Sequence, residues 1–298
     1  MCTNPISIRR VNGYKEGTYV LVPCGRCAEC CKRRQNDWYV RLSEEFRQHR
    51  TALFVTLTYD DEHVPRVEKD GKVYLSVCKK DVQCFVKRFR KSLEPRKIRY
   101  FVCAEYGPKT FRPHYHCVIF GADSNDVPIL RNAWKNGFVD ASRVRTNGSL
   151  RYVAKYCSKP AVLRYELNAP VEKTFRLVSL GLGKSYIDRP GVMEFHHNDL
   201  QKHTYYWANG FKYGLPRYLK QKIYTHAELL EIQRLNERDK LKEFRFHFTH
   251  CDRLNGRKIY WSDPYQEQQI RENDFIENNH SDAQAIFHYN KFMSKSIF

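Results

Sequence analysis

The stretch IRYFVCAEYGPKTFRPHYHCVIFG, residues 98–121, decides the fold. Two runs rich in β-branched and aromatic residues, 98–106 and 113–121, stand on either side of the turn-like segment 107–112. Such runs favour strands, and a short connection containing Gly and Pro favours an antiparallel pair. We therefore expect a β-hairpin here.

The segments around this hairpin are expected to form further strands and helices with short connections. Residues 79–93 are predicted to be an amphipathic helix, because apolar residues recur there at the i, i+3, i+4 and i+7 positions. The other expected elements are a strand at 18–22, a helix at 32–48, a strand at 52–59, a charged hairpin within 60–75 turning at Asp70-Gly71, a helix near 129–135, a strand near 137–144 and a helix holding 151–160. This order predicts an α+β protein in which helices flank an antiparallel sheet.

The chain is expected to divide into three segments. Residues 1–50 form a Cys-rich N-terminal segment packed on the core, 51–160 form the core domain, and 161–298 form an accessory and less regular C-terminal region. Within the last segment, Thr225 and Glu228 fit a capping box, which predicts a helix to about residue 243.

Composition indicates a folded protein with a polyanionic partner. Hydrophobic residues make up 42% and charged residues 29% of the chain, which excludes a disordered protein. The net charge is +19, and residues 1–160 carry 31 Lys and Arg against 16 Asp and Glu. An excess of this size suggests nucleic acid. No run reaches the ~18–20 apolar residues of a spanning helix, and MCTNPISIRR has no apolar signal-peptide core, so no membrane partner is expected.

A candidate metal site lies on the 98–121 hairpin. His114 and His116 point to one face of their strand because side chains alternate along it. If the hairpin is symmetric about its loop, Glu105 lies opposite His114 and shares that face. One carboxylate and two imidazoles with open positions suit Mn²⁺ or Mg²⁺, with Zn²⁺ left open.

The segment RYVAKYCSKP, residues 151–160, repeats Tyr-x-x-Lys. On a helix, Tyr152, Lys155, Tyr156 and Lys159 fall within one arc of about 100°, and the apolar residues fall on the opposite side. A core helix would instead bury the tyrosines. A tyrosine is a poor nucleophile unless a cation favours its phenolate, and lysines one turn away can do so or can hold a phosphate.

These motifs resemble the HUH endonucleases, and in particular the two-tyrosine replication initiators of Microviridae in the gokushovirus branch. The similar segments are His114-Tyr115-His116, FVTLT (54–58), YVAKYCSK (152–159), PCGRCAEC (23–30) and LPRYLKQKI (215–223). The resemblance implies an HUH fold with an RRM- or ferredoxin-like core. It also implies that Tyr152 and Tyr156 are nucleophiles assisted by Lys155 and Lys159.

The implied function is initiation of rolling-circle replication by a metal-dependent, single-strand DNA endonuclease that also joins strands. One tyrosine nicks the origin on the replicative duplex through a 5′-phosphotyrosine link, and the second cuts after one circuit. The expected metal ligands are Glu105, His114 and His116. The expected partners are single-stranded DNA, the origin duplex, and a host helicase and polymerase, in the cytoplasm of a bacterial host.

The segment LGLGKS, 180–185, does not supply an ATPase motor. A Walker A motif requires Gly five positions before Gly183, where this chain has Val178. Unwinding is therefore expected from the host, and strand joining without ATP.

The cysteines permit two interpretations. The chain has eleven, of which Cys24, Cys27, Cys30 and Cys31 cluster. Their Cys-x₂-Cys spacing fits a structural Zn²⁺ site that takes a ligand from elsewhere, although such sites usually separate two pairs by a longer loop. The alternative is reduced thiols packed under the helix at 32–48.

Two basic groups are candidate DNA contacts. One lies on the helix at 79–93, where a simply solvated face is an equal alternative. The other is interleaved with aromatics over 205–222, which suits stacking on single strands or an aromatic mini-core. The residues are Lys87, Arg88, Arg90 and Lys91, and Lys212, Arg217, Lys220 and Lys222.

Two other functions stay open. A non-catalytic, RRM-like nucleic-acid-binding protein would use exposed strand aromatics and no metal. An HUH transposase or relaxase would share the chemistry, but paired tyrosines with paired lysines fit the phage pattern better.

Overall fold

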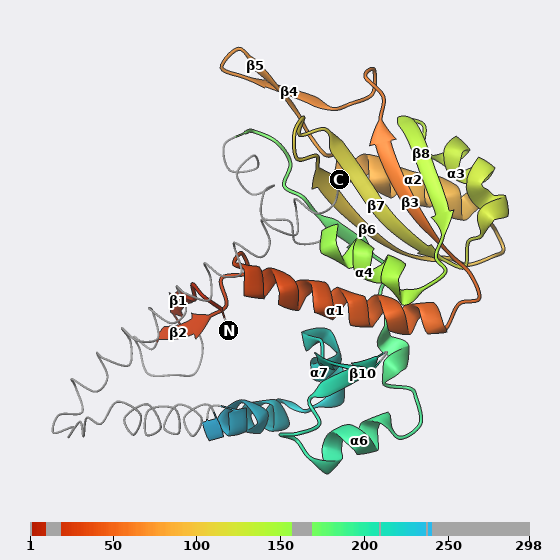
Figure 1. Ribbon diagram of the computed structural model, residues 1–298. Helices are drawn as coiled ribbons and strands as arrows, with labels where there is room; N and C mark the ends of the chain where they lie inside the picture. Colours follow the sequence, from red (N-terminus) through yellow and green to blue (C-terminus); the bar gives the residue numbers. More distant parts are fainter. Residues whose placement is uncertain (1, 10–18, 157–168, 209, 237, 240–298) are drawn as a thin grey trace. The chain divides into compact units, whose positions relative to one another are not determined.

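The computed structural model describes residues 2–9, 19–156, 169–208, 210–236 and 238–239 (Figure 1). Contacts group the described residues into two compact units, which do not coincide with the three expected segments. One unit contains those of Met1–Cys31, His196–His203 and Tyr224–Phe298, and the other those of Lys32–Phe195 and Thr204–Ile223. The second unit holds the sheet and is described first.

A five-stranded antiparallel sheet forms the centre of the second unit. Its order is β8 (Gly137–Arg143), β3 (Ala52–Tyr59), β7 (Pro113–Phe120), β6 (Arg99–Tyr106) and β9 (Arg176–Val178). Every neighbouring pair is antiparallel. With helices on both sides, this confirms the predicted α+β class with an antiparallel sheet.

One face of the sheet is closed by helices α2 (Lys79–Ser92) and α3 (Val127–Ala133). Strand alternation turns Leu53, Val55 and Leu57 to this face, where they share one core with Phe85 and Phe89 of α2. The apolar spacing that predicted the helix at 79–93 therefore describes its buried side.

Helices α1 (Ala28–Arg47) and α4 (Asn147–Tyr156) lie on the opposite face. The rings of Trp38 on α1 and Phe101 on β6 have centroids 4.7 Å apart. Helix α4 contacts β6 and β7 through Leu150, Val153 and Ala154, which are fully buried. The polar side of α4 is left to face outward.

Two hairpins have the predicted geometry. In the β6–β7 pair, Glu105 stands directly opposite His114, and the Gly107 N–H donates to the Arg112 carbonyl at 2.9 Å to close the loop. Strands β4 (Arg66–Lys69) and β5 (Lys72–Leu75) pair around Asp70 and Gly71, which have φ of +51° and +69°. Positive φ at both central positions is the condition for a tight two-residue turn.

Shorter elements complete the described chain. They are η1 (Ser124–Asp126), η2 (Lys184–Tyr186), α6 (Val192–Asn198), β10 (Tyr205–Ala208), β11 (Phe211–Gly214) and α7 (Arg217–Ile223), with β1 (Ile6–Arg9) and β2 (Tyr19–Val22) near the N-terminus. Residues 226–236 and 238–239 are helical, and Thr225 and Glu228 bond reciprocally as a capping box, as predicted. The predicted end near 243 lies outside the described residues. No helix in the described part of the chain has the length and apolar character needed to cross a membrane.

Candidate active site on the sheet

The site residues of the β6–β7 hairpin gather on the face of the sheet that α1 and α4 cover. His116 pairs with Thr56 of β3 on one side and Cys103 of β6 on the other, and His114 pairs with Glu105. Pairing across an antiparallel ladder keeps directly opposed side chains on the same face. The predicted register of Glu105 and His114 is therefore confirmed.

Glu105 and His116 form the buried part of the site. His116 Nε2 lies 3.1 Å from Glu105 Oε2, and the two side chains are 10% and 4% exposed. On its other side, His116 Nδ1 lies 3.4 Å from Thr56 Oγ1. The ring is also parallel to Phe54, at 6.0 Å between centroids and 7° between planes. A histidine held from three sides keeps a fixed orientation toward the carboxylate.

His114 is half-buried and its ring lies beside the loop glycine. A Cβ added to Gly107 would stand 3.3 Å from His114 Nε2, so the absence of a side chain at 107 makes room for the imidazole. Within the described ranges, Glu105, His114 and His116 do not bring three ligand atoms within 4.8 Å of one another. The structure thus sets His116 against Glu105 and places His114 beside them in register, with its ring turned toward the loop.

Helix α4 brings the two tyrosines to this face. Tyr152 is 51% exposed, and Lys155 on the same side is also exposed. The Tyr156 ring stacks on His116 with centroids 3.6 Å apart, and its hydroxyl donates to the Tyr152 hydroxyl. The predicted outward face of the helix is confirmed over its described residues. Lys159, the second predicted lysine, lies outside them.

The surroundings of Tyr156 disfavour its anion. Burial raises the pKa of Tyr156 well above its usual range, and the Tyr152 hydroxyl and the charge of Glu105 add to the effect. Its phenol is therefore neutral at physiological pH. A cation near Glu105 would reverse the electrostatic part of this shift.

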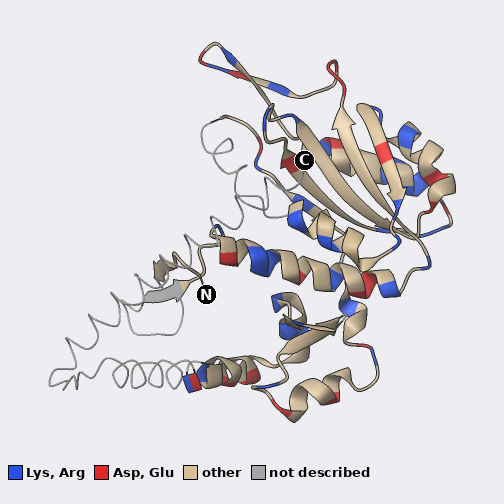
Figure 2. Ribbon diagram, in the orientation of Figure 1, with Lys and Arg blue, Asp and Glu red and all other residues tan. Residues whose placement is uncertain are grey.

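The predicted DNA contacts on α2 lie on the other side of the sheet from this site. Lys87, Arg90 and Lys91 are exposed there, among the basic residues that Figure 2 shows along the helix. Arg88 is half-buried, and its Nε donates to the Ala133 carbonyl at 2.8 Å. Arg88 thus ties α2 to the end of α3. A DNA-binding role for this face stays a prediction.

The second basic group surrounds β10, β11 and α7. Lys212 lies over the Tyr205 ring at 3.9 Å, and Arg217 and Lys222 are exposed. Burial lowers the pKa of Lys220, while the nearby Asp37 raises it. Lys220 is thereby engaged with a carboxylate inside the fold. The role of these four in DNA binding also stays a prediction.

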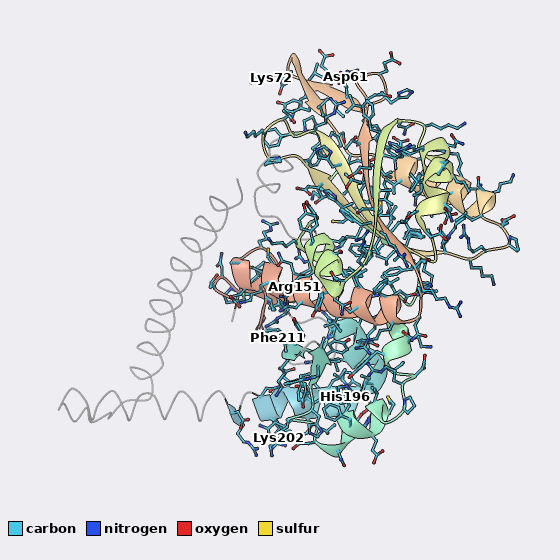
Figure 3. All side chains as sticks on the ribbon, turned by 45° about the vertical axis from the view of Figure 1, so that its right-hand side comes forward. Asp61, Lys72, Arg151, His196, Lys202 and Phe211 are labelled. Carbon is cyan, nitrogen blue, oxygen red and sulfur yellow. The ribbon has the colours of Figure 1, made fainter. Side chains whose placement is uncertain are left out.

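Arg151 is a residue that sequence reasoning did not select. It extends from α4 (labelled in Figure 3), and its Nη2 donates to the Tyr213 hydroxyl at 2.7 Å. Its guanidinium also lies 5.2 Å from the Tyr39 ring of α1. Arg151 joins the tyrosine helix to β11, a long-range contact with no local sequence signal.

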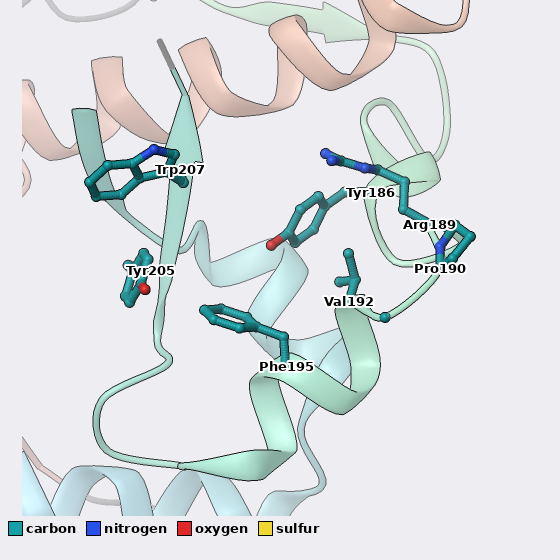
Figure 4. Close-up of a pocket in the computed structure, with 8 residues that line it drawn as sticks. Tyr186, Arg189, Pro190, Val192, Phe195, Tyr205 and Trp207 are labelled. Atoms are coloured by element: carbon teal, nitrogen blue, oxygen red, sulfur yellow. The ribbon is translucent and has the colours of Figure 1, made fainter. Parts of the chain in front are cut away.

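A pocket of about 440 Å³ lies away from the predicted site residues, between the η2–α6 segment and β10 (Figure 4). Aromatic rings and one guanidinium face it. Its lining residues are Tyr186, Arg189, Pro190, Gly191, Val192, Phe195, Tyr205 and Trp207. The aromatic run at 205–207 signalled part of this pocket, but Arg189 and Tyr186 carried no motif.

The predicted cysteine cluster is only partly brought together. Cys24, Cys27 and Cys30 converge, and the fourth sulfur of the group is that of Cys2. The thiol of Cys31 lies instead against the Arg26 carbonyl oxygen, at 3.5 Å.

The core that carries this site is similar to a class of replication-associated proteins. Residues 52–161, from β3 through α4, match the family model for the replication-associated protein ORF2. This range holds the carboxylate, both histidines and both tyrosines.

Three phage proteins are similar over longer stretches. The replication-associated protein ORF4 of Chlamydia phage 1 is 29% identical over 67% of this chain and 52% of its own length. Protein VP4 of Bdellovibrio phage phiMH2K is 26% identical, over 68% of each chain. Protein ORF2 of Spiroplasma virus 4 is 30% identical, over 55% of this chain and 56% of its own. All three are replication-associated proteins, which confirms the resemblance to the replication initiators of Microviridae.

The match spans about half the length of the first of these relatives. Among solved structures, the N-terminal nuclease domain of the minute virus of mice non-structural protein 1 shows 11% identity over 51% of this chain and 80% of its own, with a TM-score of 0.22. A likeness of that size carries no argument about the site.

Proposed function

We propose that this protein initiates rolling-circle replication as a metal-dependent, single-strand DNA endonuclease and strand-joining enzyme of the HUH type. One observation carries the proposal. The two tyrosine hydroxyls are hydrogen-bonded to each other, and the Tyr156 ring lies 3.6 Å from the ring of His116, which in turn contacts Glu105. Nucleophile and phosphate-activating groups are thus adjacent.

Glu105, His114 and His116 are the residues that would hold a divalent metal. Their donor set, one carboxylate oxygen and two imidazole nitrogens, fits Mn²⁺ or Mg²⁺ in a phosphate-processing site. Thr56 supports this role, because its hydroxyl lies near His116 Nδ1 and leaves Nε2 turned toward the carboxylate. When bound, such an ion polarises the scissile phosphate.

The tyrosines carry the bond-making steps. A Tyr oxygen attacks the phosphorus and loses its proton, while the bond from phosphorus to O3′ breaks and that oxygen leaves as a 3′-hydroxyl. The 5′-phosphate stays on the tyrosine as a diester. The second tyrosine cuts in the same way after one circuit, and the new 3′-hydroxyl attacks the first phosphotyrosine to close the circle. Each step exchanges one phosphodiester for another, so no ATP is consumed.

Lysines and external proteins complete the proposal. Lys155 shares the exposed face of α4 with Tyr152, where it can stabilise a phenolate or hold the phosphate. Lys159 is proposed to do the same from the next turn. The partners are single-stranded DNA and the origin duplex, with a host helicase and polymerase, in the cytoplasm of a bacterial cell.

The structure gives little support to a non-catalytic, RRM-like binder. That function requires aromatic side chains exposed on the sheet. Here Phe101, Tyr115 and Phe120 are all 0% exposed, because helices cover both faces. Among the large hydrophobics of the five described strands, Phe138 of β8 stands out at 69% exposed.

Covalent trapping tests the proposal. The full chain is incubated with labelled circular single-stranded DNA and Mn²⁺, and adducts that survive denaturation are counted. Tyr152→Phe with Tyr156→Phe should abolish the adduct, whereas each single change keeps some cleavage because the other hydroxyl remains. Tyr74→Phe, on the β5 strand away from the site, is the matched control and should cleave normally. An adduct formed by the double variant would overturn the nucleophile assignment.

A further inference from the structure

Four cysteine sulfurs converge in the N-terminal unit. Cys2 precedes β1, Cys24 and Cys27 lie in the connection between β2 and α1, and Cys30 is in the first turn of α1. Their Sγ atoms all lie within 4.8 Å of one another, and all four thiols are free of disulfides. Residues 22 or more positions apart in the chain are thus brought to one point.

The sulfur spacing is that of a tetrahedral metal site. Cys2 Sγ lies 3.5 Å from Cys24 Sγ and 3.8 Å from Cys27 Sγ. A disulfide requires about 2.05 Å. Four sulfurs each about 2.3 Å from a zinc ion lie about 3.8 Å from one another. The observed distances match the edges of that tetrahedron.

The backbone around the sulfurs is arranged to stabilise thiolates. The Cys24 N–H donates to Cys2 Sγ at 3.3 Å. The N–H groups of Arg26 and Cys27 both donate to Cys24 Sγ, at 3.4 and 3.3 Å. Gly25, with φ of +72°, supplies the left-handed turn that aims these donors. Hydrogen bonds to a charged acceptor favour its charged form.

The titration of the cluster agrees with this arrangement. Burial by itself would raise the pKa of Cys27, but hydrogen bonds from the backbone of Cys30 and Thr3 outweigh it and lower the pKa to about 6. Burial raises the pKa of Cys30 to about 12, and the adjacent Cys27 and Cys2 contribute to the rise. One thiolate beside neutral thiols is a group that a divalent cation would convert to several thiolates.

We propose that Cys2, Cys24, Cys27 and Cys30 hold one structural Zn²⁺ ion. Four sulfurs leave no open position, so the site is structural, and soft thiolates select Zn²⁺ over the Mg²⁺ or Mn²⁺ that suits the histidine site. The ion joins the β1–β2 hairpin to the start of α1. That hairpin has two four-residue strands and carries Ile6 and Ile8 at 48% and 45% exposed. A two-stranded hairpin with so little core needs such a crosslink.

Zinc content in variants of the full chain tests the site. The protein is purified without added metal and analysed by mass spectrometry of the elements, with one zinc per chain expected. Cys30→Ser should lose the zinc. Cys31→Ser is the matched control, since Cys31 is the buried neighbour that lies outside the group, and it should keep the zinc. His116→Ala should also keep it, which separates this ion from any metal at the histidine site.

Alkylation of the unaltered protein gives a second test that no folding defect can confuse. The four cysteines should be protected from alkylation and become reactive when a mercurial or a chelator releases zinc. Cys84, on α2, should react at the same rate before and after release. Absence of stoichiometric zinc, equal loss in the Cys30 and Cys31 variants, bound iron in place of zinc, or a Cys2–Cys24 disulfide would each overturn the proposal.

Discussion

Gly183 should tolerate no side chain, because it lies against the backbone of α1. A Cβ on Gly183 would stand 2.6 Å from the Arg41 carbonyl oxygen and 2.8 Å from Arg41 Cα. The Gly183 N–H also donates to Glu45 Oε2 at 2.8 Å. Relief of the clash in Gly183→Ala must therefore move this loop away from the helix and stretch a hydrogen bond to a buried carboxylate.

Gly191→Ala is the matched control. Gly183 and Gly191 have nearly the same φ, +74° and +75°, but a Cβ on Gly191 meets nothing within 4 Å. The left-handed strain of about 1–2 kcal/mol and the gain in unfolded-state entropy of about 0.4–1 kcal/mol apply to both and cancel. The remainder is overpacking, about 1–3 kcal/mol, and a weakened charged hydrogen bond, about 1–2 kcal/mol. Gly183→Ala should thus lose about 2–5 kcal/mol more free energy of unfolding than Gly191→Ala.

Urea unfolding followed by tryptophan fluorescence measures this difference. Trp38 and Trp134 lie in the same compact unit as both glycines, so they report its unfolding. Equal losses in the two variants would refute the close approach to α1. The result also bears on the segment LGLGKS, because a large effect would account for its second glycine by packing, with no phosphate involved.

Three further predictions concern the site and the pH response. His116→Ala should slow metal-stimulated cleavage by about 100-fold or more, because loss of a Lewis acid costs several kcal/mol, and should leave DNA binding largely intact; equal activity with and without EDTA would contradict the metal model. In Tyr152→Phe, cleavage should keep rising from about pH 7 to about pH 9, because burial raises the pKa of Tyr156; a plateau below about pH 8 would refute this. Burial raises the pKa of Asp37 from 3.8 to about 6, so the folded chain holds that proton more tightly than the unfolded chain, and the free energy of unfolding should fall as pH rises between these values. Asp37→Asn should flatten that fall, by about 1 kcal/mol after solvent screening, when unfolding is measured at several pH values; an unchanged slope would count against it.

Local patterns predicted most of the site correctly. The symmetry of the 98–121 hairpin gave the pairing of Glu105 with His114, because a six-residue loop between two equal strands fixes the register. The 100° rotation per residue gave the outward face of α4, with Tyr152 exposed and Val153 buried. Both inferences depend only on backbone periodicity, which is written in neighbouring residues.

Contacts between distant segments were not predictable in the same way. Nothing near Cys24 in the sequence points to Cys2, since the β1–β2 hairpin must fold before the two meet. Lys220 has the same composition signal as any exposed lysine, yet it lies beside Asp37 of α1. Such pairs depend on how elements pack, and packing has no short-range signature in one sequence.

The hydroxyl pair on α4 has a consequence for the order of events in the proposed reaction. When one of two hydrogen-bonded phenols ionises, the other donates to it and becomes harder to ionise in turn. Tyr152 and Tyr156 therefore behave as a single acid with one readily lost proton, not as two independent acids. Once either oxygen is esterified by phosphate, its partner no longer faces a competing anion on that oxygen. The second nucleophile then becomes available because the first has been consumed, and the alternation needs no movement of the helix.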